Sequence, residues 1–242
     1  MEKEIRIKTP DKKIVDGILY GPINKPLIVI VHGLSGNMNE AMHYNAARYF
    51  FKQGFSSFRF NLYSWHKDNR KMHECTLKTH GQDIDTVLEY LRGKGTKKIF
   101  MVGHSYGFPS ILHAKDHNFF AVASWDGTQL PHEHFVHLRK ISKPKARLMD
   151  EGAFVLLGEA MVQESQTTKT DPMVKRLHRP LLFVTNDSKD GGNLKYVRQT
   201  FKSANEPKYL HVVKGASHNF TEDGKQEQLY RETVKWFKKF LK

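Results

Sequence analysis

The sequence predicts an α/β fold in one domain, with an eight-stranded, mostly parallel sheet that carries helices on both faces. Its 242 residues lie within the range of a single α/β domain. Short apolar runs alternate along the chain with segments of helical spacing. Runs such as Leu27–Val31 contain no polar residue, which is typical of a strand buried on both faces. We therefore expect one domain over residues 1–242.

The strands are predicted from these runs. Residues 3–8 and 13–20 alternate apolar and polar residues around the turn Thr9-Pro10-Asp11, so they form an opening hairpin. Six further runs follow, and each is expected to be a strand of the same sheet: 27–31, 55–60, 98–102, 119–124, 181–185 and 208–213.

Helices are predicted between the strands. Apolar residues repeat at helical spacing over 42–50 and 84–91, and glycines follow both segments at Gly54 and Gly93. A last amphipathic helix is expected over about residues 225–241.

One segment interrupts this alternation. The residues between Ser124 and Leu181 carry helix signals, strongest over 153–162, and no convincing strand. Because a plain connection of this length is rare in a compact domain, we expect residues 126–179 to form a helical cap inserted after the sixth strand.

Composition excludes several classes of protein. The apolar fraction of 39% is that of a folded chain, and no apolar stretch is long enough to span a membrane. The single cysteine, Cys75, cannot form an internal disulfide, which favours a reducing compartment and a cytoplasmic protein. The net charge of +14 favours anionic ligands, but no nucleic-acid motif is present, so nucleic acid is not an expected partner.

Gly103-His104-Ser105-Tyr106-Gly107 directly follows a predicted strand and precedes a segment that can be helical. Gly-x-Ser-x-Gly in this position predicts a nucleophile elbow, in which a sharp turn exposes the serine hydroxyl. Pro109 is compatible with a helix that begins at the elbow, because the first turn needs no N–H from it. Ser105 is therefore the candidate nucleophile.

A serine nucleophile needs a base, and His218 is the candidate. It lies in a loop between the last strand and the last helix, at the edge of the sheet where active sites gather. An acid that orients the imidazole is expected between Ser105 and His218 in the chain. We favour Asp190 over Asp187, since glycines follow it, and keep Asp126 as a third candidate.

The oxyanion of the reaction needs two N–H donors. The residue after the nucleophile, Tyr106, is expected to supply one. The loop His32-Gly33-Leu34-Ser35-Gly36 is expected to supply the other from Leu34, with His32 as a scaffold residue. His132, His134 and His137 form the one cluster that hints at a metal, but neither cysteine nor a repeated acid accompanies them. No metal or cofactor is expected.

With these motifs in this order, the chain resembles the α/β-hydrolases. It is similar to small serine esterases of the cinnamoyl/feruloyl esterase and acyl-aminoacyl-peptidase-like kind. The resemblance implies a capped eight-stranded sheet and no cofactor. The chain departs from it after the seventh strand, where Thr185-Asn186 stands in place of the usual glycine before the acid.

We therefore expect a serine hydrolase that cleaves a small-molecule carboxylic ester or thioester through an acyl-enzyme. The positive charge favours a substrate with an anionic group. Acyl transfer or lyase chemistry on the same residues is an alternative, because a fold does not determine a reaction. A non-catalytic protein with a basic binding surface is another. The sequence does not predict the oligomeric state.

Overall fold

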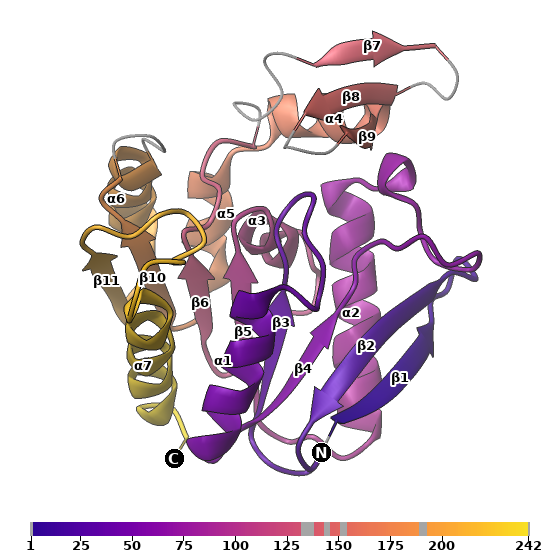
Figure 1. Cartoon of the computed structure of the whole chain (residues 1–242). Coiled ribbons are helices and arrows are strands. Elements are labelled where there is room, and N and C mark those ends of the chain that lie inside the picture. Colours follow the sequence, from indigo (N-terminus) through magenta and orange to yellow (C-terminus); the bar gives the residue numbers. More distant parts are fainter. Residues whose placement is uncertain (1, 132–137, 143–145, 151–153, 189–192, 242) are drawn as a thin grey trace.

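The computed structural model describes residues 2–131, 138–142, 146–150, 154–188 and 193–241. Its main feature is one eight-stranded sheet with the order β1-β2-β4-β3-β5-β6-β10-β11 (Figure 1). The hairpin strands β1 and β2 pair antiparallel, β2 also pairs antiparallel with β4, and every pair from β4 to β11 is parallel. The strands are β1 (Glu2–Lys8), β2 (Ile14–Tyr20), β3 (Leu27–Val31), β4 (Ser56–Phe60), β5 (Ile99–His104), β6 (Val122–Trp125), β10 (Leu181–Asn186) and β11 (Lys208–Val213).

All eight strands predicted from the sequence are present, and the predicted fold class is confirmed. The central strands β3, β4, β5, β6 and β10 are buried at every residue, which explains their lack of polar alternation. Edge strand β11 is only partly buried over most of its length. Neighbouring parallel strands therefore end side by side, and the loops that follow them meet at one edge of the sheet.

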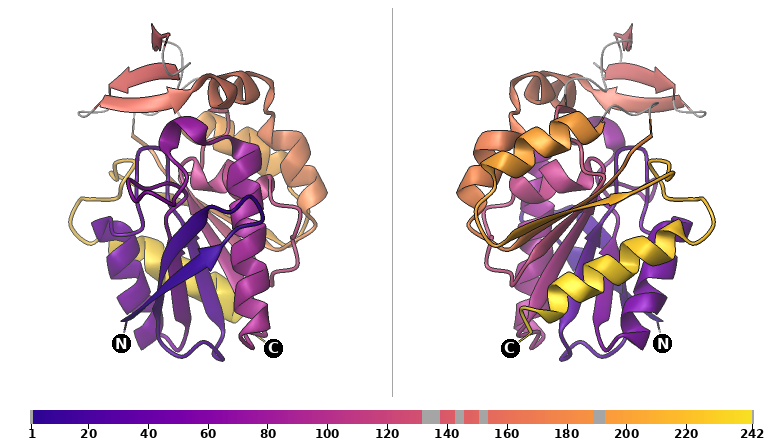
Figure 2. Two further views of the ribbon diagram at one scale, coloured as in Figure 1. Left: turned by 90° about the vertical axis from the view of Figure 1, so that its right-hand side faces the viewer. Right: turned by 90° about the vertical axis from the view of Figure 1, so that its left-hand side faces the viewer.

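Helices cover both faces of the sheet (Figures 1 and 2). On one face, α1 and α7 bury residues such as Phe50 and Phe237 against the strands. On the other face, α2, α3, α5 and α6 bury residues such as Val87, Ile111 and Val197. The helices are α1 (Ala41–Lys52), α2 (Leu77–Gly93), α3 (Gly107–Leu112), α4 (Glu159–Thr167), α5 (Thr170–Leu177), α6 (Asn193–Ser203) and α7 (Lys225–Lys238), with a short 3-10 helix at Met72–Glu74.

The segment inserted after β6 differs from the prediction. It was expected to be helical, but its described part contains a three-stranded antiparallel sheet, β7 (Arg139–Ile141), β8 (Ala146–Asp150) and β9 (Phe154–Gly158), before α4 and α5. Residues 154–158 lie within the segment 153–162, where the sequence predicts a helix. This apolar run pairs with β8 along its whole length, and the pairing satisfies its backbone N–H and C=O groups. The local periodicity of the sequence does not reveal such a pairing.

The insert lies over the carboxyl edge of the main sheet (Figures 1 and 2). Its side chains pack with residues from the start of α2 and from the elbow, in a cluster of buried residues that includes Leu77, Tyr106, Leu157 and Met161. Close contact also occurs at Gly158, where an added Cβ would lie 2.1 Å from the carbonyl oxygen of His73. None of the helices in the described parts of the chain has the length and apolarity needed to cross a bilayer.

Candidate active site

The candidate residues lie at the ends of four adjacent strands. The sheet order β5-β6-β10-β11 places Ser105, which follows β5, beside Asp126, which follows β6. The next strand ends at Asn186, and the loop after β11 carries His218. Parallel strands lie about 4.8 Å apart, so residues distant in sequence become neighbours here.

Ser105 occupies a sharp turn between β5 and α3. Its φ angle is +49°, a left-handed conformation that is uncommon for a residue other than glycine. Its N–H donates to the carbonyl of Trp125 at 3.0 Å, and its own carbonyl accepts from the N–H groups of Phe108 (3.2 Å) and Thr128 (3.0 Å). The surrounding backbone therefore holds the strained turn in place.

The two glycines of the elbow are required by close backbone contacts. A Cβ at Gly107 would lie 2.3 Å from the carbonyl oxygen of Val31, and one at Gly103 would lie 2.7 Å from the Cα of Phe108. Pro109 lies in the first turn of α3, as predicted. The sequence pattern and the local geometry thus agree at the elbow.

His218 is paired with a buried carboxylate. Its Nδ1 donates to Oδ2 of Asp126 over 2.6 Å, while 47% of its side-chain surface remains exposed. With the proton on Nδ1, the other ring nitrogen keeps the lone pair that a base needs. Asp126 is the third candidate for the acid, and it is the one of the described candidates that pairs with His218.

Asp126 is held by several donors. Its Oδ1 accepts from Thr185 Oγ1 at 2.5 Å and from Asn193 Nδ2 at 3.0 Å, and its Oδ2 also accepts from Asn186 Nδ2 at 2.8 Å. Its side chain is 3% exposed. These hydrogen bonds give partners to the buried carboxylate oxygens, which would be costly to leave unsatisfied.

The two other acid candidates have different positions. Asp190 lies outside the described residues. Asp187 accepts a hydrogen bond from the backbone N–H of Gly215 at 2.7 Å, at the start of the loop that carries His218. Among the described residues it makes no hydrogen bond with His218. This contact stabilises the start of the loop. Asp126, and not Asp187, is the aspartate that pairs with the imidazole.

The loop after β3 passes beside the nucleophile. A Cβ at Gly33 would lie 3.0 Å from the Cβ of Ser105, so a larger residue at this position would crowd the nucleophile. Leu34, the expected oxyanion donor, follows it directly, and its N–H donates to no acceptor in the described part of the chain. Tyr106, the other expected donor, follows Ser105 and begins α3 as its N-cap.

Both ring nitrogens of His32 are occupied by hydrogen bonds to the backbone. Its Nδ1 donates to the carbonyl of Gly33 at 2.8 Å, and its Nε2 accepts the N–H of Leu62 at 3.0 Å. Burial lowers the pKa of His32 from 6.5 to about 4, so the ring is neutral near pH 7. These contacts are those of the scaffold residue that the sequence predicts.

His104 joins the elbow to the loop of the base. Its Nε2 donates to the backbone carbonyl of His218 at 3.2 Å, and the two rings lie 4.8 Å apart. No hydrogen bond between Ser105 Oγ and His218 is found in the described part of the chain. Burial holds the pKa of His104 well below its usual range, so His104 is a neutral donor.

Solved structures with the same architecture include Est1E from Butyrivibrio proteoclasticus with ferulic acid bound. That structure superposes with a TM-score of 0.84 at 19% identity, over 98% of this chain and 99% of the other. The chain has the α/β-hydrolase fold. The esterase domain of a Rhodothermus marinus protein matches with a TM-score of 0.81 at 15% identity, over 100% of both chains. A dienelactone hydrolase from Anabaena variabilis matches with a TM-score of 0.73 at 13% identity, over 100% of this chain and 99% of the other.

Sequence comparison adds a narrower match. Residues 23–114 match a family described as "Putative serine esterase", and this segment includes the loop after β3 and the elbow but not Asp126 or His218. No curated protein matches the chain in sequence. The family match covers less than half of the chain, and the structural matches, at their low identities, show the fold alone.

The residues that support the acid were not singled out from the sequence. In the sequence, Thr185 and Asn186 differ from the glycine of the resembling esterases, and nothing in the sequence distinguishes Asn193 as a donor. Two signals were present: Asp126 directly follows a predicted strand, and the end of the next strand in the sheet offers donors in place of an acid. Their significance depends on β6 and β10 being neighbours, which only the folded sheet shows.

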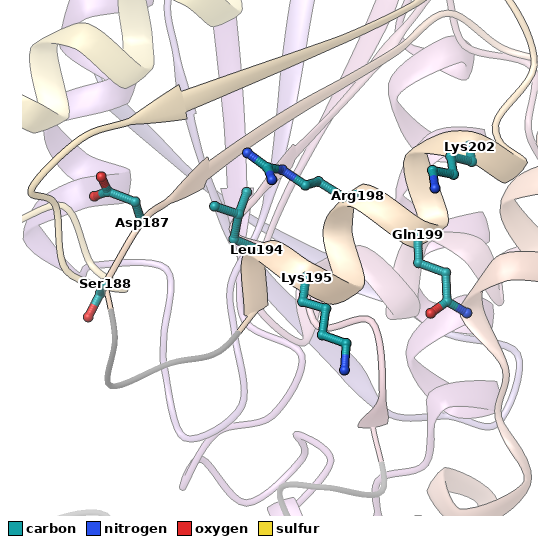
Figure 3. Close-up of a pocket in the computed structure, with 7 residues that line it drawn as sticks. All are labelled: Asp187, Ser188, Leu194, Lys195, Arg198, Gln199 and Lys202. Atoms are coloured by element: carbon teal, nitrogen blue, oxygen red, sulfur yellow. The ribbon is translucent and has the colours of Figure 1, made fainter.

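A separate hollow of about 630 Å³ lies along α6 (Figure 3). Three cations line it together with Asp187, but Lys195 and Arg198 extend from the helix in different directions (Figure 3). The cations do not converge on one point, so this hollow is not a built site for a single anion. The lining residues are Asp187, Ser188, Leu194, Lys195, Arg198, Gln199 and Lys202.

Proposed function

We propose that the protein is a serine hydrolase that cleaves carboxylic esters or thioesters with Ser105, His218 and Asp126. The observation that carries this proposal is the 2.6 Å contact between His218 Nδ1 and the buried Asp126 carboxylate, beside a strained serine at an elbow. This is the arrangement in which a carboxylate orients an imidazole and stabilises its protonated form. Asp126 replaces Asp190 as the proposed acid.

In the proposed first half-reaction, His218 Nε2 takes the proton of Ser105 as Oγ bonds to the carbonyl carbon of the substrate. The backbone N–H groups of Leu34 and Tyr106 stabilise the negative charge on the carbonyl oxygen. The bond to the leaving group then breaks, and the leaving group takes the proton from His218. The acyl group remains on Ser105 as an ester.

In the second half-reaction, His218 takes a proton from water as the water oxygen attacks the acyl carbon. Collapse of this intermediate returns the proton to Ser105 Oγ and releases the acid. Both steps need His218 Nε2 within about 3 Å of the reacting hydroxyl, and such contacts often tighten only with substrate bound. The half-exposed imidazole has room for this approach.

The insert packs beside the candidate site, since Leu157 and Met161 share a buried cluster with Tyr106. Tyr106 connects the elbow to α4 through a hydrogen bond between its hydroxyl and Ser165 Oγ. We propose that this insert, residues 126–179, acts as a cap that selects the acyl group. The net charge of +14 supports a substrate with an anionic group, and the single, buried Cys75 supports a reducing, cytoplasmic location.

The test is hydrolysis of p-nitrophenyl acetate and butyrate, together with labelling by a fluorophosphonate probe. We expect turnover and labelling of the unaltered protein, and neither with Ser105→Ala. A neighbouring serine variant, Ser110→Ala, is the control for non-specific labelling. Equal turnover by the unaltered protein and Ser105→Ala would refute the proposed nucleophile.

A further inference from the structure

A second group of titratable side chains lies behind the candidate triad. Glu40 directly precedes α1, His43 lies in the first turn of that helix, and His104 ends β5. One oxygen or nitrogen of each side chain lies within 4.8 Å of those of the other two. The proposed hydrolysis uses none of these three side chains as nucleophile, base or acid.

Both imidazoles hold a proton on one nitrogen only. His104 Nε2 donates to the carbonyl of His218 at 3.2 Å, and His43 Nδ1 lies 3.1 Å from the carbonyl of Asn37. A carbonyl oxygen can only accept, so each of these nitrogens carries the hydrogen. The other nitrogens, His104 Nδ1 and His43 Nε2, then hold lone pairs, and neither has a partner among the described residues.

These lone pairs are buried, since His43 is 0% and His104 is 4% exposed. A buried polar atom without a partner needs an explanation, and an ion is one. Histidines that bind a metal usually donate their second ring N–H to a backbone carbonyl or carboxylate. Both imidazoles here already make that contact. Burial lowers the pKa of His43 to about 3, so its lone pair is not lost to a proton near neutral pH.

Glu40 Oε2 lies 3.4 Å from His43 Nδ1, so Glu40 must move toward Nε2 before the three side chains can share an ion. The two rings lie 5.8 Å apart, centre to centre, with an angle of 63° between their planes. Ligand atoms around a tetrahedral zinc, each about 2.1 Å from the metal, stand about 3.4 Å apart. Glu40 can supply the movement and the entry path, because 35% of its side chain is exposed.

We propose that Glu40, His43 and His104 form a binding site for a divalent transition-metal ion of the zinc class. Two neutral imidazoles and one carboxylate are a ligand set that zinc accepts, with the fourth position left to water. No metal site was expected from the sequence. The proposal is independent of the proposed ester hydrolysis, because it can be tested by binding alone.

An ion here would act on the neighbouring base. His104 contacts both His43 and His218, so the positive charge would lie close to the imidazole that must become protonated during catalysis. A cation bound to His104 and a protonated His218 would repel each other, because the two rings lie only 4.8 Å apart. We therefore expect the metal to slow hydrolysis reversibly.

The experiment titrates tag-free, chelator-treated protein with Co²⁺, followed by visible absorption, and with Zn²⁺, followed by calorimetry. We expect one ion per chain and the visible bands of tetrahedral Co²⁺. Glu40→Gln and His43→Gln should each weaken binding by at least about tenfold. The same titrations on Ser105→Ala should match the unaltered protein, which separates this proposal from the proposed nucleophile.

The matched control is His113→Gln, which alters a partly buried histidine whose Nδ1 also meets a backbone carbonyl, that of Pro109 at 2.8 Å. It should bind Co²⁺ as the unaltered protein does. Thermal melts in the presence of chelator show whether His43→Gln folds. If His43→Gln does not fold, Glu40→Gln still tests the proposal, because it changes only a partly exposed side chain. Equal affinity in the unaltered protein, Glu40→Gln and His43→Gln, or no binding at all, would overturn the proposal and leave a buried water as the partner of the lone pairs.

Discussion

At the scale of residues, the candidate site depends on one buried carboxylate. Asp126 adopts a φ angle of +40°, which an aspartate tolerates better than most residues, and its N–H donates to Val184 at 2.7 Å. This backbone position turns the carboxylate toward the loop of His218. The same residue therefore links the end of β6, the neighbouring strand β10 and the candidate base.

Asp126→Asn should leave the fold intact and lower kcat for p-nitrophenyl butyrate by about 10⁴-fold, because an amide no longer selects the Nδ1–H tautomer of His218. The matched controls are Asp187→Asn and Asp190→Asn, each of which should lower kcat less than tenfold. Steady-state kinetics on the three variants measures the difference. If Asp190→Asn caused the large loss and Asp126→Asn did not, the assignment of the acid would be wrong.

Gly107→Ala tests the elbow at the same scale. Its Cβ would lie 2.3 Å from the Val31 carbonyl, so β3 or α3 must move. We expect a loss of about 1–3 kcal/mol in the free energy of unfolding, as for overpacking, together with loss of fluorophosphonate labelling. Gly93→Ala is the control, since an added Cβ there meets nothing within 4 Å. Urea unfolding of both variants measures the effect.

At the scale of elements, the end of β10 supports the carboxylate that follows β6. Thr185 and Asn186 are the last residues of β10, and both donate to Asp126. The first residue of α6, Asn193, donates as well. In this chain the end of β10 therefore provides donors to the carboxylate that follows its neighbour β6.

Asn186→Ala should therefore destabilise the protein by about 1.5–3 kcal/mol, the typical contribution of a hydrogen bond to a charged group, and also reduce kcat. The control is Asn205→Ala, which removes an exposed hydrogen bond of 2.6 Å to the carbonyl of Lys175. Thermal unfolding and ester turnover distinguish the two variants. Unchanged stability in Asn186→Ala would show that the remaining donors suffice for Asp126.

At the scale of the whole molecule, buried neutral histidines make stability depend on pH. Burial lowers the pKa of His32 from 6.5 to about 4 and holds the pKa of His80 well below its usual range. The unfolded chain therefore binds protons at these residues at a higher pH than the folded chain does. Their contribution is fully present above about pH 6.5, and for His32 it is lost as the pH falls from there through the folded pKa of about 4.

We expect the free energy of unfolding to fall between pH 6.5 and about pH 4, by on the order of 3 kcal/mol for His32 alone. Urea unfolding at several pH values measures this slope. His32→Gln should reduce the number of protons taken up on unfolding by about one. Glutamine can donate to the Gly33 carbonyl and accept from the Leu62 N–H without titrating. A slope that stays the same in this variant would contradict the assigned neutral state of His32.

The net charge of +14 also acts over the whole molecule. A positive field raises the local concentration of anions, and salt screens it over about 10 Å at 0.1 M. We expect kcat/KM for an ester with a distant carboxylate to fall as the salt concentration rises, while kcat/KM for p-nitrophenyl butyrate stays nearly constant. Parallel salt series on the two substrates provide the measurement. Equal responses would remove the argument for an anionic substrate.

Much of this protein was determined by the sequence alone. Apolar runs identified all eight strands of the main sheet, and the Gly-x-Ser-x-Gly pattern identified the elbow of Ser105. Both features depend on a few neighbouring residues, because strand burial, turn geometry and the requirement for glycine are local. The three strands of the insert, the pairing of Asp126 with His218 and the cluster of Glu40, His43 and His104 came only from the tertiary structure. Each of these depends on which strands and loops become neighbours, and the pairing of distant segments leaves little trace in local periodicity.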